Sequence, residues 1–137
     1  MTAPAAGPTV GRTVTHRRYV PYSHAHYAGN LVDGAYSLAA FGDVATEMCI
    51  VTDGDEGLFA SYSDVQFRAP VRAGDVIEIE ARLVRVGTRS REMEFEVRVV
   101  GRGAPERGES SADLLDPPLV ATTARGVVVV PPSASDS

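Results

Sequence analysis

The sequence predicts an α+β fold in which an antiparallel five-stranded sheet wraps around one long central helix. Three observations lead to this fold class. Residues 31–51 carry apolar side chains at helical spacing. Residues 76–86 and 92–100 alternate apolar and charged side chains, as the strands of a half-solvated antiparallel pair do. Three further segments rich in β-branched or aromatic residues complete the strands, and a sheet curled around a single helix buries all of these apolar faces together.

The bulk composition limits the possible partners and chemistry. The chain has 137 residues, 44% of them hydrophobic, which is enough for the core of a single domain. Its formal charge of −5 argues against nucleic acid or an anionic membrane as the main partner. All 13 basic residues are arginine, so no lysine is present to form a Schiff base. We see neither a signal-peptide core nor a run of about 20 apolar residues, and expect a cytoplasmic protein.

The two ends and one internal stretch are predicted to lie outside the regular structure. Residues 1–12 are small and rich in proline and glycine, and we expect a flexible N-terminal segment. The domain then spans residues 13–130, and residues 131–137 form a flexible tail. Within the domain, the polar stretch 101–118, "GRGAPERGESSADLLDPP", predicts a long mobile connection.

The first strand is predicted at residues 13–20, where "TVTHRRYV" ends at a proline. The helix follows at residues 31–51 and is apolar over most of its circumference, which indicates that it is largely buried. Its one cysteine, Cys49, is interpreted as a buried structural thiol. One stripe at helical spacing consists mostly of small residues: Leu31, Ala35, Leu38, Gly42, Ala45 and Cys49. Because one helix covers one sheet face, we expect a second copy to complete the burial in a dimer.

The remaining strands follow the helix. "TDGDEG" at residues 52–57 is a turn, and "LFASYSDVQF" at residues 58–67 is a strand. A pair of strands then turns at "GTRSR", with inward positions Ile77, Ile79, Ala81 and Leu83 in the first and Met93, Phe95, Val97 and Val99 in the second. "LVATTARGVVVV" at residues 119–130 is the last strand.

Two acids on the helix are the first functional candidates. Asp43 and Glu47 are four residues apart and share a face, and no basic residue lies between His26 and Arg68 to pair them locally. If the two carboxyl groups are buried, their pKa values rise, as a proton-transfer catalyst requires. If they meet solvent or a distant arginine, such as Arg17 or Arg18, they are ordinary surface residues. The spacing leaves both interpretations open.

The residues before the helix offer a second candidate group. His24 and His26 could face solvent in a turn, and two histidines without a cysteine partner do not predict a metal site. The backbone amides around Asp33 and Gly34 open the helix, where unpaired N–H groups favour a developing oxyanion. Asp33 itself suits the helix dipole as a first-turn acid.

A third candidate is the turn "VGTRSR" at residues 86–91, which brings Arg89, Ser90 and Arg91 together. Arginines there could bind phosphates in a bidentate way, although exposed arginines are also common in turns that bind nothing.

With these residues in hand, the chain resembles the hotdog-fold superfamily of acyl-CoA enzymes, and within it the 3-aminobutyryl-CoA or β-alanyl-CoA ammonia lyases. The resemblance covers residues 23–97 and rests on "HAHYAGNLVDGA", "FGDVATE", "DGDEGLF", "FRAPVRAGD" and "VGTRSREMEFE" in this order. More distantly, the chain looks like hotdog acyl-CoA thioesterases.

The resemblance implies dimers or larger homo-oligomers with active sites at the dimer interface. The thioester carbonyl would lie at the helix N-terminus, near Asn30, Asp33 and Gly34. Phe67 and Pro70 would flank the pantetheine channel. The residues in the CoA-contacting turn would be Gly87, Arg89, Ser90 and Arg91.

Carried over in this way, the resemblance implies reversible removal of ammonia from a 3-aminoacyl-CoA to give a 2-enoyl-CoA. Asp43 or Glu47 would take the α proton, and the other would hold the leaving ammonium. The amides near Gly34, helped by Asn30 or His26, would stabilise the enolate-like charge. No cofactor or metal is expected, because the CoA thioester of the substrate is the electron sink.

Three alternatives remain at this point. In related thioesterases the catalytic acid stands seven residues after the glycine corresponding to Gly34, and here that residue is Phe41. Another thioesterase branch has a carboxylate where His26 stands. The acid that hydrolysis uses is thus absent at both positions, which disfavours a thioesterase. An acyl-CoA thioesterase, an enoyl-CoA hydratase and a non-catalytic acyl-CoA-binding protein are nevertheless kept as alternatives to the lyase.

Overall fold

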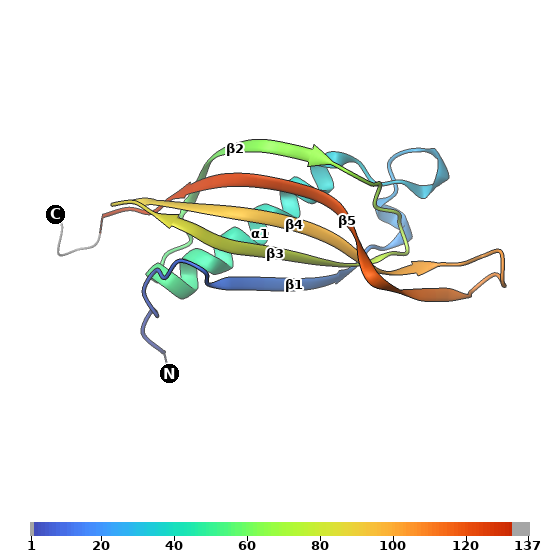
Figure 1. Ribbon diagram of the computed structural model, residues 1–137, viewed down its shortest axis with the longest axis horizontal. Helices are drawn as coiled ribbons and strands as arrows, with labels where there is room; N and C mark the ends of the chain where they lie inside the picture. Colours follow the sequence, from blue (N-terminus) through green and yellow to red (C-terminus); the bar gives the residue numbers. More distant parts are fainter. Residues whose placement is uncertain (1, 133–137) are drawn as a thin grey trace.

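The computed structural model describes residues 2–132 and contains the predicted sheet and helix. The five strands form one antiparallel sheet in the order β1-β3-β4-β5-β2, which curves over a single long helix, α1 (Figure 1). The strands are β1 (Thr13–Tyr19), β2 (Leu58–Phe67), β3 (Val76–Val86), β4 (Ser90–Gly103) and β5 (Ala112–Val129). The helix α1 spans Gly34–Asp53, and two short 3-10 turns precede it, η1 (Tyr22–His24) and η2 (Ala28–Asn30).

The helix α1 begins later than the apolar pattern predicts. Asp33 is its N-cap, and the Asp33 carboxylate accepts a hydrogen bond from the Tyr36 amide at 3.1 Å. Val32 lies before the helix, and its amide donates to the Val71 carbonyl at 3.0 Å. At the other end, Gly54 adopts the left-handed conformation with φ of 67°, which ends the helix.

The core lies between α1 and the inner face of the sheet. The predicted alternation of β3 and β4 is confirmed, because the apolar positions of both strands face the helix and are buried. Pairs such as Ile79 with Val97 and Ala81 with Phe95 stand opposite each other across the two strands. Phe41 of α1 stacks on Phe95 at a ring separation of 5.0 Å, so the centre of the helix is fixed against the centre of the sheet.

The helix is less buried in the single chain than its composition predicts. Its buried side consists of Ser37, Ala40, Phe41, Val44, Ala45, Met48, Cys49 and Thr52. The small-residue stripe is divided between two environments, because Ala45 and Cys49 are buried whereas Ala35 is exposed. The reason is geometric: the sheet covers one side of the helix, and no element of the described chain covers the other.

The predicted mobile connection at 101–118 is in fact a β-hairpin. Strands β4 and β5 continue through most of it, and only residues 104–111 form the turn between them. This extension, which we call the arm (residues 101–119), projects beyond the sheet at the end where α1 begins (Figure 1). Arg102 ties the arm to the body, because its guanidinium binds the buried Asp75 through both carboxylate oxygens and also donates to the Pro70 carbonyl.

The N-terminal segment, predicted as flexible, has no regular secondary structure but is hydrogen-bonded to the body. The Ala6 amide donates to the Val51 carbonyl at 2.8 Å, and the Gly11 amide donates to the Leu83 carbonyl at the same distance. Part of residues 2–12 therefore packs near the C-terminal half of α1. Of the predicted C-terminal tail, residues 133–137 lie outside the described residues.

Candidate active site at the start of the central helix

A cavity of about 440 Å³ lies where α1 begins. It is enclosed by the helix start, the end of β2 and the loop that follows β2. Its lining residues are Tyr27, Val32, Asp33, Gly34, Ser37, Phe67, Arg68, Ala69, Pro70, Val71 and Thr122. Four predicted site residues, Asp33, Gly34, Phe67 and Pro70, are therefore brought together here.

Two contacts give this cavity its walls. The loop after β2 runs beside the segment that leads into α1, where the Ala73 amide donates to the Asn30 carbonyl at 2.8 Å. The Phe67 ring lies directly against Gly34. A Cβ atom built on Gly34 would lie 2.7 Å from the Phe67 ring, so a larger residue here would displace this exposed ring.

The deep side of the cavity is polar but satisfied. The Ser37 and Thr122 hydroxyls, both buried, are hydrogen-bonded to each other at 3.0 Å. This pair joins α1 to β5 beneath the cavity and leaves its floor without a charged group.

The helix start provides hydrogen-bond donors for a ligand. The Tyr36 amide is occupied by Asp33, but among residues 2–132 no group accepts a hydrogen bond from the amides of Gly34 and Ala35. Unpaired amides at the positive end of a 20-residue helix favour a developing negative charge. The cavity is therefore suited to a carbonyl group that gains negative charge during a reaction.

The other predicted residues before the helix lie at the edge of this cavity. His26 Nδ1 is 4.0 Å from Asp33 Oδ2, which makes His26 a neighbour of a lining residue. Asn30 ends η2 with φ of 61°, its side chain is exposed, and it is not among the lining residues. His24 is not among the lining residues, and its Nδ1 lies 2.9 Å from the Tyr36 hydroxyl.

Asp43 and Glu47 lie on the exposed face of α1, next to β1. Arg18 donates to Asp43 Oδ2 at 2.9 Å, and His16 Nε2 lies 3.0 Å from Glu47 Oε1. The two carboxylate side chains remain 63% and 53% exposed. In the single chain neither carboxyl group is buried. For Asp43 the other interpretation holds, in which the carboxylate is exposed and pairs with a distant arginine, Arg18.

The predicted phosphate-contacting turn lies at the opposite end of α1. Gly87 and Ser90 close the turn between β3 and β4, where the Gly87 amide donates to the Ser90 carbonyl at 2.9 Å. The Arg89 side chain is exposed. A 20-residue helix is about 30 Å long, so this turn is too distant to complete the cavity at Gly34 within the same chain.

Arg91 differs most from its predicted role. It is buried, and its Nη2 and Nε donate to the two carboxylate oxygens of Asp53 at 2.7 and 2.9 Å. Its Nη1 donates to the Gly87 and Ser90 carbonyls. The hydrogen bonds from Arg91 hold the pKa of Asp53 below its usual value. Arg91 therefore fastens the end of α1 to the turn and does not present its guanidinium to a ligand.

Cys49 lies near the C-terminal end of α1 and is buried, as predicted. Burial, and then the negative charge of Asp53, raise the pKa of the Cys49 thiol to about 11. Among residues 2–132, no three His, Cys, Asp or Glu side chains gather as metal ligands would.

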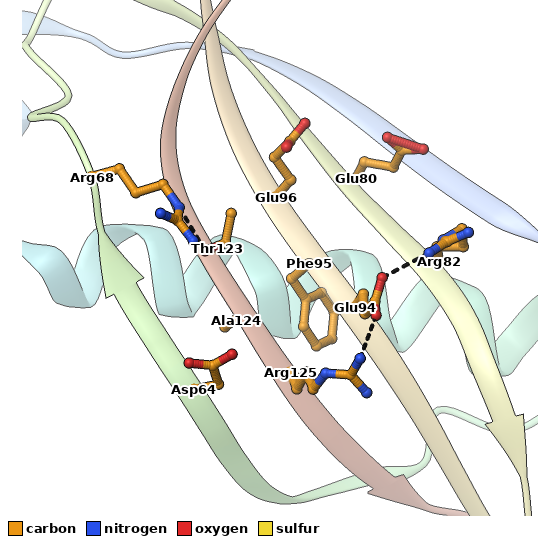
Figure 2. A pocket seen from close by; sticks show the side chains of 10 residues that line it. All are labelled: Asp64, Arg68, Glu80, Arg82, Glu94, Phe95, Glu96, Thr123, Ala124 and Arg125. Carbon is orange, nitrogen blue, oxygen red and sulfur yellow. Dashed lines mark hydrogen bonds and ion pairs between the residues drawn. The ribbon is translucent and has the colours of Figure 1, made fainter.

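A second cavity, of about 420 Å³, lies on the outer face of the sheet. Five of its seven charged side chains are ion-paired. Glu94 accepts hydrogen bonds from both Arg82 and Arg125 (Figure 2). Glu80 and Glu96 accept from Arg98, which does not line the cavity. Arg68 is the only residue that lines both cavities.

Comparison with known proteins shows the family. Residues 29–105, more than half of the chain, match the family model described as the thioesterase superfamily. The chain belongs to this superfamily. It is also 51% identical over 107 residues to the 3-aminobutyryl-CoA ammonia lyase of Acetoanaerobium sticklandii, an alignment that covers 78% of this chain and 85% of that protein.

Solved structures agree with this placement in the thioesterase superfamily. The β-alanyl-CoA:ammonia lyase from Clostridium propionicum matches with a TM-score of 0.85 and 34% identity, covering 94% of this chain and 90% of that chain. A hexameric hotdog-fold thioesterase of Campylobacter jejuni matches with a TM-score of 0.69 and 22% identity over 83% of this chain and 79% of that one. The predicted hotdog fold is confirmed. No helix in the described part of the chain has the length and apolar character that crossing a membrane requires.

Sequence reasoning did not identify several lining residues, among them Tyr27, Ser37, Arg68 and Thr122. Tyr27 and Arg68 directly adjoin predicted positions, so their neighbours were a usable signal. Ser37 and Thr122 are 85 residues apart and meet only because β5 crosses the helix start. No local sequence pattern predicts that contact.

Proposed function

We propose that this protein is a 3-aminoacyl-CoA ammonia lyase, a carbon–nitrogen lyase that reversibly converts a 3-aminoacyl-CoA into the 2-enoyl-CoA and ammonia. The observation that carries the proposal is the 51% identity to a 3-aminobutyryl-CoA ammonia lyase. The cavity at the helix start supports it, because this chemistry requires donors that stabilise an enolate-like oxygen. 3-Aminobutyryl-CoA and β-alanyl-CoA are the substrates we propose to test first.

The helix start is assigned the electrophilic role. The thioester carbonyl oxygen accepts hydrogen bonds from the amides of Gly34 and Ala35, which acidifies the C–H bond at Cα. A base takes that proton, the electron pair forms the new C=C bond, and the C3–N bond breaks to release ammonia. The thioester is the electron sink, so the reaction needs no further cofactor.

The position of the base requires a second copy of the chain or a different residue. Asp43 follows Gly34 by nine residues, about 13 Å along the helix axis, and lies on the face next to β1. We infer that Asp43 and Glu47 act in the cavity of a partner copy. The exposed edge of β2 supports such pairing, because an unpaired edge strand accepts another strand and Leu58 there is 77% exposed.

Asp33 with His26 is the alternative within one chain. Asp33 lines the cavity and caps the helix, and His26 lies 4.0 Å away. Replacement of single residues decides between the two pairs. Crotonyl-CoA and ammonium are added to the protein, and loss of the enoyl absorbance is followed. A large loss of rate in Asp43→Asn or Glu47→Gln, with Asp33→Asn active, assigns the base to the exposed pair.

Mixing variants then tests whether the site spans two copies. Asp43→Asn is refolded together with Gly34→Val, whose cavity is blocked. If the acid serves the partner's cavity, the mixed oligomers recover part of the wild-type rate. If every mixture stays as inactive as its parents, the two-copy site is wrong.

An acyl-CoA thioesterase is the second candidate, because the superfamily includes hydrolases. One observation disfavours it: Phe41, where related thioesterases are expected to carry the acid, is fully buried against Phe95. Release of free CoA thiol from crotonyl-CoA without ammonium would establish hydrolysis. Saturable binding without turnover would instead establish a non-catalytic binder, and addition of water without ammonium a hydratase.

A further inference from the structure

Arg68 occupies a distinctive position beside the candidate active site. It follows β2 directly, and its amide donates to the Ala121 carbonyl at 2.7 Å, which fixes its backbone against β5. Its Nε donates to the Thr123 hydroxyl at 3.2 Å (Figure 2). Arg68 therefore stands at the boundary between the cavity at the helix start and the outer face of the sheet.

The charge of Arg68 is not neutralised by the described chain. Among residues 2–132, no carboxylate lies within ion-pair distance of it, although the protein has 18 acids and only 13 arginines. Its neighbours on the same face, Arg82 and Arg125, are both paired with acids. Asp64, on the preceding strand β2, instead accepts a hydrogen bond from the Gln66 amide group.

The geometry leaves the terminal nitrogens of Arg68 available. Only Nε is engaged by a side chain, so both terminal amino groups of the guanidinium remain free within the described chain. A guanidinium with two free adjacent donors matches the oxygens of a phosphate in a bidentate way. The hydrogen bond from Nε to Thr123 favours one orientation of this exposed side chain.

The arginines of the turn between β3 and β4 do not serve the same cavity. Arg91 is fully engaged by Asp53 and two carbonyls, and the turn lies about 30 Å from Gly34 along the helix. Among the residues that the structure describes, Arg68 is the only cationic side chain that lines the cavity.

We propose that Arg68 binds a phosphate group of the CoA part of the substrate and so anchors the thioester in the cavity at the helix start. The proposal rests on the proposed function for the identity of the substrate. The phosphate is either in the diphosphate bridge or at the 3′ position of the ribose, and both present the same oxyanion chemistry.

Truncated substrates test this role directly. Arg68→Gln keeps a polar side chain of reduced length and removes the charge. Addition of ammonium is measured with crotonyl-CoA, crotonyl-dephospho-CoA and crotonyl-pantetheine, the last of which has no phosphate. We expect Arg68→Gln to raise KM for crotonyl-CoA roughly tenfold, as loss of a charged hydrogen bond does, with kcat nearly unchanged. For crotonyl-pantetheine, wild type and Arg68→Gln should behave alike.

Dephospho-CoA then locates the phosphate. If the effect of Arg68→Gln disappears with crotonyl-dephospho-CoA, the 3′-phosphate is the ligand, and if it persists, the diphosphate is. Equal effects on crotonyl-CoA and crotonyl-pantetheine would overturn the proposal, because Arg68 would then act on the cavity's shape and not on a phosphate. No effect on either substrate would overturn it as well.

Two further arginines provide matched comparisons. Arg85 is exposed on β3 and remote from the cavity, so Arg85→Gln should leave both substrates unaffected. Arg89→Gln tests the predicted turn instead. A CoA-specific loss in Arg89→Gln without one in Arg68→Gln would assign the phosphate to the turn and refute the proposal.

A binding measurement separates this inference from the proposed reaction. Titration calorimetry with CoA and with pantetheine requires no turnover. Weaker binding of CoA by Arg68→Gln, with pantetheine unchanged, supports the phosphate contact even if every acyl-CoA proves inert. Equal CoA affinity in wild type and Arg68→Gln refutes the contact even if the lyase activity is found.

Discussion

The two ends of helix α1 contain the same kinds of groups but differ in what those groups can bind. At the C-terminal end, Asp53 and Arg91 satisfy each other in a buried bidentate pair. At the N-terminal end, Asp33 satisfies the Tyr36 amide, while the first two amides of the helix and the terminal nitrogens of the Arg68 guanidinium have no partner in the described chain. The difference teaches that an arginine or a helix terminus indicates a ligand only when the fold leaves it unsatisfied. We call the C-terminal end, with Asp53 and Arg91, the closed end of the helix, and the N-terminal end, with Gly34, the open end. The closed end should therefore govern the stability of the fold, and the open end should govern catalytic activity.

The largest expected effect breaks the closed end. Arg91→Ala leaves the Asp53 carboxylate without its partner in a mostly buried position, and we expect the free energy of unfolding to fall by about 3 kcal/mol or more. Urea unfolding measures this change. The neighbouring Arg89→Ala is the control and should change stability by less than about 0.5 kcal/mol, because its side chain is exposed. Similar losses in both variants would contradict the closed-end interpretation.

Acid should weaken the same ion pair. The pKa of Asp53 is lowered by Arg91, so the stabilisation from its charge is complete above the unfolded pKa of about 3.9 and is lost as the pH falls through the native pKa. The difference in stability between wild type and Asp53→Asn should be constant from pH 7 to about pH 5 and should shrink below pH 4. A difference that stays unchanged down to pH 2.5 would mean that the charge of Asp53 does not matter.

A substitution at the open end should reduce activity strongly and stability only slightly. In Gly34→Ala the new methyl group would lie 2.7 Å from the Phe67 ring, so the ring must shift, and this changes the shape of the cavity. We expect kcat/KM for crotonyl-CoA and ammonium to fall about tenfold or more, because a small misplacement of the thioester is costly. Stability should change much less than in Arg91→Ala. Normal activity in this variant would show that the cavity is not the site of reaction.

The smallest effect comes from a second glycine of the same helix. Gly42→Ala adds a methyl group that meets no side chain or other element of the described chain within 4 Å, and alanine is more stable than glycine in a helix interior by up to about 1 kcal/mol. A modest rise in stability with unchanged activity is expected from unfolding and rate measurements. A loss of activity would instead indicate that a partner copy packs on this face.

The fold was predictable because its core follows simple periods. The alternation in β3 and β4 placed Ile79 and Val97 correctly, since a strand with one buried face must alternate. The arm was not predicted because it lacks such a period. Strands at 101–103 and 112–118 extend beyond the core, so no apolar alternation marks them, and their glycines and prolines look like a loop.

The site was predictable only where a local motif defines it. Asp33 and Gly34 indicate a helix start. The contact of Ser37 with Thr122 instead depends on the packing of α1 against β5, which lie far apart in the sequence. The inward position of Arg91 could have been predicted from the alternation of its strand. It has the same parity as Met93, whose side chain faces the core, so Arg91 had to point inward as well.

The buried state of Cys49 has a practical consequence. A thiolate-specific colour reagent at neutral pH has almost nothing to react with on this protein, because the only sulfhydryl is shielded and stays protonated until strongly alkaline conditions. Any colour that develops during turnover must come from CoA set free by hydrolysis. The distinction between breaking a carbon–sulfur bond and breaking a carbon–nitrogen bond can thus be made in one cuvette, with the enzyme itself silent.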